Sequence, residues 1–564
     1  MAQLKNSSRI FLLLFLLGAW IRGLDVWRPV DGSVRESWRE CDIASVARNF
    51  YQEGMNILYP RIDWRGDGPG FAEMEFPALP WTTALFYKLF GYNEIYGRVL
   101  VYVFSLLSLI VFFRLSAYMF EPFAAYVAST FFVMSPLIIK MSNSLQPEGL
   151  MIFLYILAVY SFLRWLEGNK GSWFSIAMLA TSLCILFKVN SIHIGLLFLI
   201  LLIKNRGFSA LRDLKIWFFG LISLLPAVVW HLHARQFWLI YGNSLGVSNE
   251  SHWIGLDILT KPIFFFKLAN RELFNVWMPL GWIVALVALW FLRSRKDIKI
   301  LYYWLLVLLF YFLVTIRTTG DSWAWYYHIV TVPAAALLFG AGADYLRSQV
   351  EKTKRLLLTF LFAVSVAFVL ILARESGANL EGPIMQVTVA VLLPGVLALY
   401  FMMGKNRFEP SFLFAKSFKW NTLLAGGIVF CLTSTVMFQG YTNSRELHPD
   451  LNQNLFVCAQ EFKSDIPDDS IIIASGGVSL DDTGRPVAFN APYFFFWLNR
   501  KGFNVSKEDQ SIDTVRALMN RGASYYILEK DALTDNPEFL SEMKEEFTLI
   551  KHCSIAYLFK LTSQ

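Results

Sequence analysis

Apolar residues along this chain are grouped in long blocks, and polar residues are concentrated between the blocks. A helix needs about 20 mostly apolar residues to cross a bilayer. We identify about thirteen such blocks, at residues 9–24, 97–120, 123–140, 148–166, 172–187, 190–204, 214–234, 274–292, 300–316, 326–345, 355–373, 383–403 and 421–439. The pattern predicts a mainly α-helical, polytopic membrane protein.

Three of these blocks need comment. The first follows Lys5 and Arg9, as the apolar part of a signal peptide would. It lacks a cleavage site with small residues and many further blocks follow, so we expect a retained helix. The fifth and sixth blocks are short and are interrupted only around residues 188–190.

Lys and Arg gather in four loops, which favours a cytoplasmic position for these loops. They are Lys204, Arg206, Arg212 and Lys215; Arg293, Arg295, Lys296 and Lys299; Arg347, Lys352, Lys354 and Arg355; and Lys405, Arg407, Lys416 and Lys419. This orientation places the long first loop (residues 25–96) and the tail (residues 441–564) outside. We expect a membrane domain at residues 1–440 and an extracytoplasmic domain at residues 441–564, in a plasma or inner membrane.

The tail differs in composition from the rest of the chain, and it predicts a small α/β domain. Short apolar runs lie at residues 471–475, 525–528, 547–550 and 555–559, and helix-like stretches lie at residues 454–463 and 512–520. Cys458 and Cys553 both lie in the tail, on the side that we expect to be oxidising. They are either bridged or two buried thiols.

The long first loop carries two amphipathic stretches. Asp42 is placed to cap a helix from residue 43 to about residue 52, which would lie along the membrane surface. A second helix is expected at residues 77–90, with Pro77 near its first turn. Asp42 and Glu75 stand at these helix starts. Each either caps free N–H groups or serves in catalysis as a carboxylate base.

Further polar residues stand at the expected outer ends of spans. Glu148 opens the fourth span, either as an acid at a helix start or as part of a site. Lys188 lies between two spans, where it either reaches to the interface or binds a lipid phosphate. Tyr327 and His328 begin the tenth span in a stretch that an aromatic belt explains in part.

Composition and charge narrow the class of protein. Of the 564 residues, 56% are hydrophobic and 16% are charged, which excludes an ordinary soluble enzyme or a disordered chain. The net charge of +7 is mostly a signal of topology, so we expect no nucleic-acid partner. The five cysteines show no zinc or redox spacing.

Acids of the long first loop and cations of later spans would face one another in a cavity at the outer leaflet. Such a cavity suits an enzyme that takes a sugar from a lipid phosphate. A base removes the proton of the acceptor hydroxyl, and cations stabilise the departing phosphate. Because that leaving group is a monophosphate, we expect no required cofactor. A divalent metal is not indicated, since the loop has no compact Asp-x-Asp.

At these residues the chain resembles the membrane glycosyltransferases of the GT-C fold, in particular the family 39 and aminoarabinose-transferase-like group, which uses polyprenyl-phosphate sugars. The likeness in motifs lies mainly in residues 38–150. It consists of Arg39-x-x-Asp42-x-Ala44-x-x-Ala47-Arg48-Asn49-Phe50, Gly54, Tyr59-Pro60, Glu75-Phe76-Pro77 and Gln146-Pro147-Glu148.

The resemblance implies that Asp42 is the catalytic base and that Glu75 assists it. Lys188 lies where a phosphate-binding lysine is expected, and Tyr327 and His328 lie in a stretch near the donor cavity.

Many relatives begin the loop with adjacent Asp-Glu. Here the corresponding pair is Arg39-Glu40, which makes Glu40 a rival for the base. Arg39 and Arg48 are further candidates for binding the phosphate, and Glu148 is a candidate for binding substrate.

The sequence thus predicts an inverting glycosyltransferase in contact with membrane lipids. It would move a hexosyl or pentosyl group from a polyprenyl-phosphate donor to a hydroxyl of a glycan, lipid or protein acceptor at the outer face. A transporter or lipid flippase is an alternative, but it predicts interrupted helices with charges at the midplane, whereas these charges stand at span ends. A non-catalytic scaffold acting through the tail is a second alternative.

Overall fold

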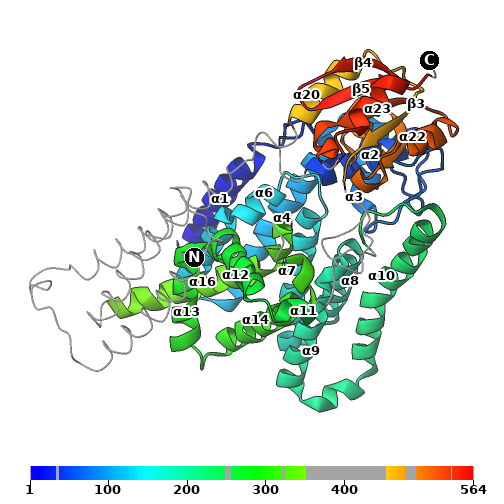
Figure 1. Cartoon of the computed structure of the whole chain (residues 1–564). Helices are drawn as coiled ribbons and strands as arrows, with labels where there is room; N and C mark the ends of the chain where they lie inside the picture. Colours follow the sequence, from blue (N-terminus) through cyan, green and yellow to red (C-terminus); the bar gives the residue numbers. More distant parts are fainter. Residues whose placement is uncertain are drawn as a thin grey trace, which may run out of the picture.

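The computed structural model describes residues 2–33, 37–247, 256–319, 324–350, 453–477, 491–534 and 536–562. In these residues a helical bundle carries a small α/β unit at one end (Figure 1). The expected spans at residues 355–373, 383–403 and 421–439, and the expected domain boundary near residue 440, lie outside the described residues.

The helices of the bundle form at the apolar blocks of the sequence. They are α1 (Ala2–Gly23), α4 (Ile95–Met119), α5 (Pro122–Met134), α6 (Pro136–Met141), α7 (Glu148–Gly168), α8 (Gly171–Phe187), α9 (His193–Arg206), α10 (Leu214–Tyr241), α11 (Leu256–Leu259), α12 (Pro262–Arg271), α13 (Met278–Phe291), α14 (Lys296–Val314), α15 (Ile316–Thr319) and α16 (Val332–Val350). Tighter or wider turns connect them: η1 (Val189–Ile192), η2 (Phe208–Arg212), η4 (Glu272–Trp277) and η5 (Trp325–Thr331).

The mainly helical membrane architecture is confirmed, but the count of thirteen spans is not. Among the described residues, six helices are long and apolar enough to cross a membrane, or seven if the bent pair formed by Pro262–Trp277 and Gly281–Phe291 is one span. One reason is visible at the expected span 123–140. It forms two helices, α5 and α6, because Pro136 has no N–H to continue the helix past Ser135.

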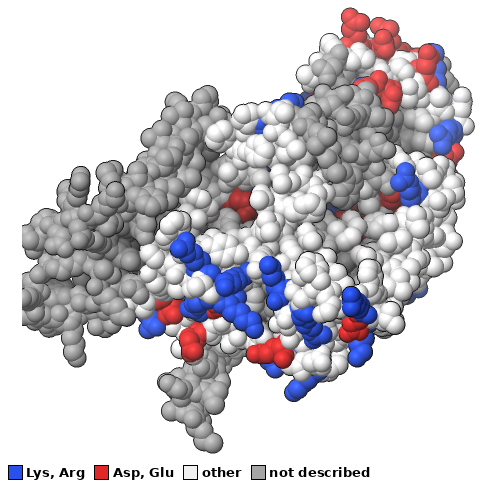
Figure 2. Space-filling view, turned by 90° about the horizontal axis from the view of Figure 1, so that it is seen from below, with Lys and Arg blue, Asp and Glu red and all other residues white. Residues whose placement is uncertain are grey.

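Basic side chains gather on the face of the molecule that lies away from the tail (Figure 2). Lys204 and Arg206 end α9, while Arg295 and Lys296 begin α14. Both turns lie at the lower end of the bundle in Figure 1, opposite the tail. Two of the loops that the sequence assigns to one side of the membrane therefore share one face of the protein.

The long first loop forms α2 (Ser37–Glu53) and α3 (Ala78–Phe90). The second agrees with the expected helix at residues 77–90. The first begins six residues earlier than expected, so Asp42 lies inside the helix and does not cap it. Nearly all residues of α2 up to Phe50 are buried, because α3 and the tail cover the helix.

The tail folds as the α/β unit that its composition predicts. Its helices are α20 (Gln453–Phe462), α21 (Tyr493–Leu498), α22 (Ile512–Met519) and α23 (Phe539–Glu546), with 3₁₀ turns η7 (Lys507–Asp509) and η8 (Lys530–Leu533). Its strands are β1 (Ile471–Ser475), β2 (Lys501–Val505), β3 (Ala523–Glu529), β4 (Thr548–His552) and β5 (Ala556–Lys560). The sheet order is β2-β1-β3-β5-β4, with β1 parallel to β2 and β3, and with β5 antiparallel to β3 and β4. Sequence reasoning missed β2, α21 and α23.

The long first loop closes the free edge of β2. Gly502 N–H donates to the Asp63 carbonyl over 3.2 Å, and Gly66 N–H donates back to the Gly502 carbonyl. On the other side, the Trp497 indole N–H of α21 donates to the Val30 carbonyl over 2.7 Å. An uncovered edge strand pairs readily with other chains, so the hydrogen bonds at Gly502 protect the edge of the sheet. Together with the bond from Trp497, they tie the tail to the long first loop.

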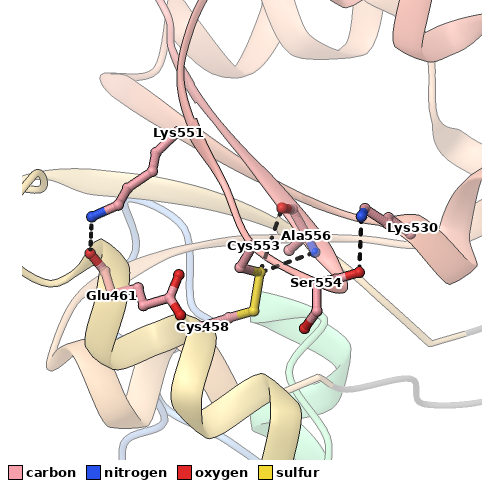
Figure 3. Close-up of a disulfide and its surroundings, with 7 residues drawn as sticks. All are labelled: Cys458, Glu461, Lys530, Lys551, Cys553, Ser554 and Ala556. Atoms are coloured by element: carbon pink, nitrogen blue, oxygen red, sulfur yellow. Dashed lines mark hydrogen bonds between the residues drawn. A yellow bond between two sulfur atoms is a disulfide. The ribbon is translucent and has the colours of Figure 1, made fainter.

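A disulfide between Cys458 and Cys553 joins α20 to the turn after β4 (Figure 3). The first of the two alternatives for this pair is therefore confirmed. Around it, the Ala556 N–H donates to Cys553 Sγ over 3.2 Å, and Lys551 Nζ donates to the Glu461 carbonyl over 2.8 Å. The bridge closes a loop with a sequence separation of 95 residues.

We predict that replacing both bridge cysteines, Cys458→Ser with Cys553→Ser, destabilises the tail by about 2–5 kcal/mol, because the unfolded tail gains conformational freedom. Thermal unfolding of the purified protein with and without a reductant measures this effect. The matched control is Cys184→Ser with Cys41→Ser, whose thiols are free in the structure. The control keeps the bridge, so the reductant should lower its stability as it lowers that of the wild type, whereas the bridge variant should unfold alike with and without the reductant. A bridge variant whose unfolding still changes on reduction would contradict the assignment.

Candidate active site

Four charged side chains from separate segments meet beside α2. Arg39 lies on α2, Glu75 precedes α3, Glu148 opens α7 and Lys188 follows α8. Lys188 Nζ is 2.7 Å from Glu75 Oε1 and 2.9 Å from Glu148 Oε1. The Arg39 guanidinium is 3.0 Å from Glu148 Oε1 and 3.6 Å from Glu75 Oε1. We call these four residues the charge cluster.

Local sequence explains how two of these side chains reach the cluster. Glu148 follows Pro147, which stands at the start of α7, where a proline is tolerated. Gly149 comes next, and a Cβ atom there would lie only 2.5 Å from Val101 Cγ1, so the glycine lets α7 approach α4 closely. Lys188 leaves α8 in an extended conformation, with φ −153° and ψ 99°, which turns it away from the helix.

The charge cluster is almost completely removed from water. The exposed fraction of the side chain is 8% for Arg39, 5% for Lys188 and 1% for Glu148, but 20% for Glu75. Charges this deeply buried are tolerated only when they are paired, and here two cations face two anions. Glu75 is the member of the cluster with the most access to an incoming molecule.

The opposite charges keep the members of the cluster ionised. Burial alone would raise the pKa of Glu75, but Lys188 and Arg39 outweigh it and lower that pKa to about 2. Burial and Arg39 would lower the pKa of Lys188, but the two carboxylates raise it above its ordinary value. The Glu75 carboxylate therefore stays charged far below neutral pH.

Two tyrosines of η5 complete the surroundings of the cations. The Arg39 guanidinium lies 4.4 Å from the centre of the Tyr326 ring. Lys188 Nζ lies 5.4 Å from the Tyr326 ring and 5.2 Å from the Tyr327 ring. These are cation–π distances. The structure thus brings the sequence-predicted Tyr327 to Lys188, and it adds Tyr326.

Glu40 is engaged elsewhere. Its two carboxylate oxygens lie 2.7 and 3.0 Å from the Arg98 guanidinium on α4. One of them also accepts from the Leu145 N–H at 2.9 Å and from Ser144 Oγ at 3.1 Å. The carboxylate oxygens of Glu40 are thus occupied by Arg98 and by the segment before α7. These contacts hold α2 against α4 and against that segment.

Asp42 lies on α2 one turn after Arg39 and is completely buried. Its Oδ1 accepts a hydrogen bond of 2.9 Å from the indole N–H of Trp64, a residue of the same long loop. Asp42 is thus three residues from Arg39 of the charge cluster, but the long first loop and the tail cover it.

Arg48 lies apart from the charge cluster. It binds the buried Asp63 and donates to the Phe496 carbonyl of α21 over 2.8 Å. Asp63 also binds Lys501 of β2, and it accepts from Asn49 at 2.8 Å. Both cations hold the pKa of Asp63 below its ordinary value, although burial opposes them. Arg48 therefore contacts the tail and is not a member of the charge cluster.

His328 is packed in the turn that carries the two tyrosines. Its Nδ1 is 2.7 Å from Glu272 Oε1, its Nε2 is 2.9 Å from the Thr319 carbonyl, and its ring stacks on Phe312. These contacts join η5 to η4. Sequence reasoning missed Glu272, which carries no motif and lies 56 residues from its partner.

No group of three or more His, Cys, Asp or Glu side chains is arranged to hold a metal ion in the parts of the chain that the structure describes.

Comparison with known proteins now defines the class. Residues 71–233 match the family model for dolichyl-phosphate-mannose-protein mannosyltransferase. The chain as a whole has the fold of the GT-C membrane glycosyltransferases, which confirms the resemblance in the sequence. With its apolar helices, this fold makes the chain an integral membrane protein.

Two solved structures illustrate the match. ArnT from Cupriavidus metallidurans bound to undecaprenyl phosphate is 14% identical, with 97% of this chain and 97% of that chain covered and a TM-score of 0.53. The archaeal oligosaccharyltransferase AglB from Archaeoglobus fulgidus, in complex with an inhibitory peptide and a dolichol-phosphate, is 12% identical. The match covers 98% of this chain and 74% of the AglB chain, with a TM-score of 0.55. No curated protein sequence matches the chain.

We predict that Glu40→Gln destabilises the protein by about 3–5 kcal/mol, because Arg98 is left buried without its counter-charge. Thermal unfolding in detergent measures the loss. The control is Glu53→Gln, which removes a more exposed partner of Arg65 and should cost about 1 kcal/mol or less. Equal stability of both variants would show that Glu40 does not anchor α2.

Proposed function

We propose that this protein is an inverting glycosyltransferase, which moves a sugar from a polyprenyl-phosphate donor to an acceptor hydroxyl at the outer face of the membrane. One observation carries the proposal: Lys188 and Arg39 lie with two carboxylates and two tyrosines in one buried cluster. The GT-C fold supports it.

The cations of the cluster suit the phosphate of a lipid-linked sugar. The planar guanidinium of Arg39 and the ammonium group of Lys188 both donate hydrogen bonds that phosphate oxygens accept. The structural neighbours agree with this chemistry, since ArnT was solved with undecaprenyl phosphate and AglB with a dolichol-phosphate. Two cations are sufficient to stabilise a departing monophosphate, so no metal is required.

The cluster is electrically neutral before the donor binds, so an arriving phosphate competes with a carboxylate for the cations. Glu75 is the carboxylate that gives way, because its side chain is 20% exposed whereas that of Glu148 is 1% exposed. Once the phosphate takes Lys188 and Arg39, these cations no longer favour the charged form of Glu75, and its pKa rises from about 2. The released carboxylate is then a stronger base.

In the transfer step, a carboxylate takes the proton of the acceptor hydroxyl, and the acceptor oxygen attacks the anomeric carbon. The bond between that carbon and the phosphate oxygen breaks, and its electron pair goes to the phosphate. A single displacement of this kind inverts the anomeric carbon. Asp42 and Glu75 are the two candidate bases. The exposure of Glu75 and its contact with Lys188 favour Glu75, while the family resemblance favours Asp42.

The sidedness of the reaction belongs to the same proposal. Disulfides persist in extracytoplasmic compartments, so the bridge between Cys458 and Cys553 supports a tail that faces outward. The basic turns on the opposite face of the bundle support the same orientation. We assign residues 1–440 to the membrane domain and residues 441–564 to the outer domain of a plasma or inner membrane protein.

Carboxamide variants separate the two candidate bases. Glu75→Gln is expected to lower the transfer of radiolabelled sugar from an undecaprenyl-phosphate-linked donor by about 10²–10⁴-fold in membranes that supply the acceptor. Asp42→Asn is measured alongside it, and Glu53→Gln, remote from the cluster, is the control with full transfer. If both Asp42→Asn and Glu75→Gln keep full transfer, the proposed site is wrong. Mass spectrometry of the lipid that co-purifies with the protein identifies the donor.

Chelation tests the role of the cations. Because Lys188 and Arg39 stabilise the leaving phosphate, we expect transfer to persist at an undiminished rate in excess EDTA. Lys188→Ala should abolish transfer with or without added Mg²⁺ or Mn²⁺. Loss of wild-type transfer in EDTA, with recovery on adding either ion, would overturn the metal-independent mechanism.

A further inference from the structure

The turn that follows Lys188 determines where its ammonium group points. α8 ends at Phe187, and the 3₁₀ turn η1 begins directly after Lys188. The Ser191 N–H donates to the Lys188 carbonyl over 3.0 Å and closes this turn. A shift of η1 moves Lys188 relative to its carboxylates, so the contacts that hold η1 bear on the charge cluster.

A chain of hydrogen bonds holds η1 from within the bundle. The Trp304 indole N–H on α14 donates to Tyr155 Oη on α7 over 3.0 Å. Tyr155 Oη is 3.1 Å from His193 Nε2, and His193 Nδ1 is 2.8 Å from the Asn190 carbonyl. An indole nitrogen only donates and a carbonyl only accepts, so the two ends set the direction of the chain. Tyr155 donates to Nε2, and the Nδ1–H group of His193 donates to Asn190.

A second branch joins η1 to the turn that carries the tyrosines. The Asn190 amide donates to Tyr311 Oη on α14 over 3.3 Å, and Tyr311 Oη donates to the Tyr327 carbonyl over 3.3 Å. The His193 and Tyr311 rings lie 4.6 Å apart. The second branch therefore connects Asn190, two residues after Lys188, with Tyr327, whose ring lies beside Lys188 Nζ.

All of these polar side chains are buried in an apolar bundle. Tyr155 and Trp304 have no exposed surface, and Tyr311, His193 and Asn190 are 3%, 6% and 8% exposed. Polar groups in such surroundings are costly unless every one finds a partner. Apolar residues of the same size would pack between α7, α9 and α14 without that cost. The network ends at η1, which follows Lys188, and at Tyr327, which contacts Lys188. We therefore expect it to do more than fill space in the bundle.

We infer that Asn190, His193 and Tyr311 are positioning residues for the donor phosphate. Their hydrogen bonds hold Lys188 and Tyr327 in one fixed geometry, so that the ammonium group meets the phosphate without first having to be ordered. This inference rests on the proposed function, because the phosphate of a polyprenyl lipid is the ligand that Lys188 is taken to bind.

Tyr311→Phe tests the inference most directly, since it removes only the hydroxyl that joins Asn190 to Tyr327. We expect the affinity of the purified full chain for undecaprenyl phosphate to fall about tenfold, because part of the binding free energy must then be used to order Lys188. The control is Tyr303→Phe on the same helix, a half-buried tyrosine outside the network, which should bind as the wild type does. Undecaprenol, which lacks the phosphate, sets the background.

A double-mutant cycle distinguishes positioning from general loss of packing. If Tyr311 acts through Lys188, the combination of Tyr311→Phe with Lys188→Ala binds undecaprenyl phosphate no more weakly than Lys188→Ala alone. Losses that multiply in the double variant would assign Tyr311 a purely structural role and overturn the inference. Melting temperatures of all variants, measured in parallel, show that binding is compared between folded proteins.

Conservative rescue provides a second readout at His193. His193→Asn keeps an N–H near the place of Nδ1 and should retain more affinity than His193→Leu, which removes both ring nitrogens. Equal affinity of these two variants would contradict the proposed hydrogen-bond direction. If Lys188→Ala binds undecaprenyl phosphate as tightly as the wild type, the proposed function itself fails. If Lys188→Ala loses binding while Tyr311→Phe and His193→Leu do not, only the positioning role fails.

Discussion

The pairing of opposite charges in a region without water is the constraint on which the rest of this structure depends. Arg39, Glu75, Glu148 and Lys188 come from four separate segments, and none of them tolerates burial unless the others are present. The requirement draws α2, the start of α7 and the end of α8 to one point. A cluster that is neutral when empty is also one in which an anionic ligand can exchange for a carboxylate.

The same constraint operates a second time where the tail meets α2. Asp63 is buried between Arg48 of α2 and Lys501 of β2, so the long first loop and the tail share one set of ion pairs. α2 thus carries a charge cluster toward its beginning and a docking site toward its end. Together with Glu40 and Arg98, these pairs fix the helix on three sides.

Patterns that depend on near neighbours could be read from the sequence. The strands at residues 471–475 and 523–529, and the helix of residues 78–90, follow local apolar periodicity, and the structure contains them. Glu75, Glu148 and Lys188 could be singled out because charges are rare beside apolar spans, and Arg39 because it belongs to the motif that carries the family resemblance. The residues that these charged side chains bind could not be predicted from the sequence. Glu40 and Arg48 have the same local appearance as Arg39, and only tertiary contacts, across 58 residues to Arg98 and 448 to Phe496, give them other roles. His193 and Tyr311 lie inside apolar blocks, where a single polar residue gives no signal of a network.

The contact between α2 and α21 has a consequence for how the protein is made. Arg48 is synthesised 448 residues before Phe496, whose carbonyl it binds. The face of α2 that the tail covers is therefore completed only near the end of translation, after the bundle helices have been inserted. Burial of α2, the helix that carries Arg39, is therefore completed late in biogenesis. A chain that stalls in the membrane before its last segment emerges has the residues of the charge cluster, but not the cover over the helix that carries Arg39.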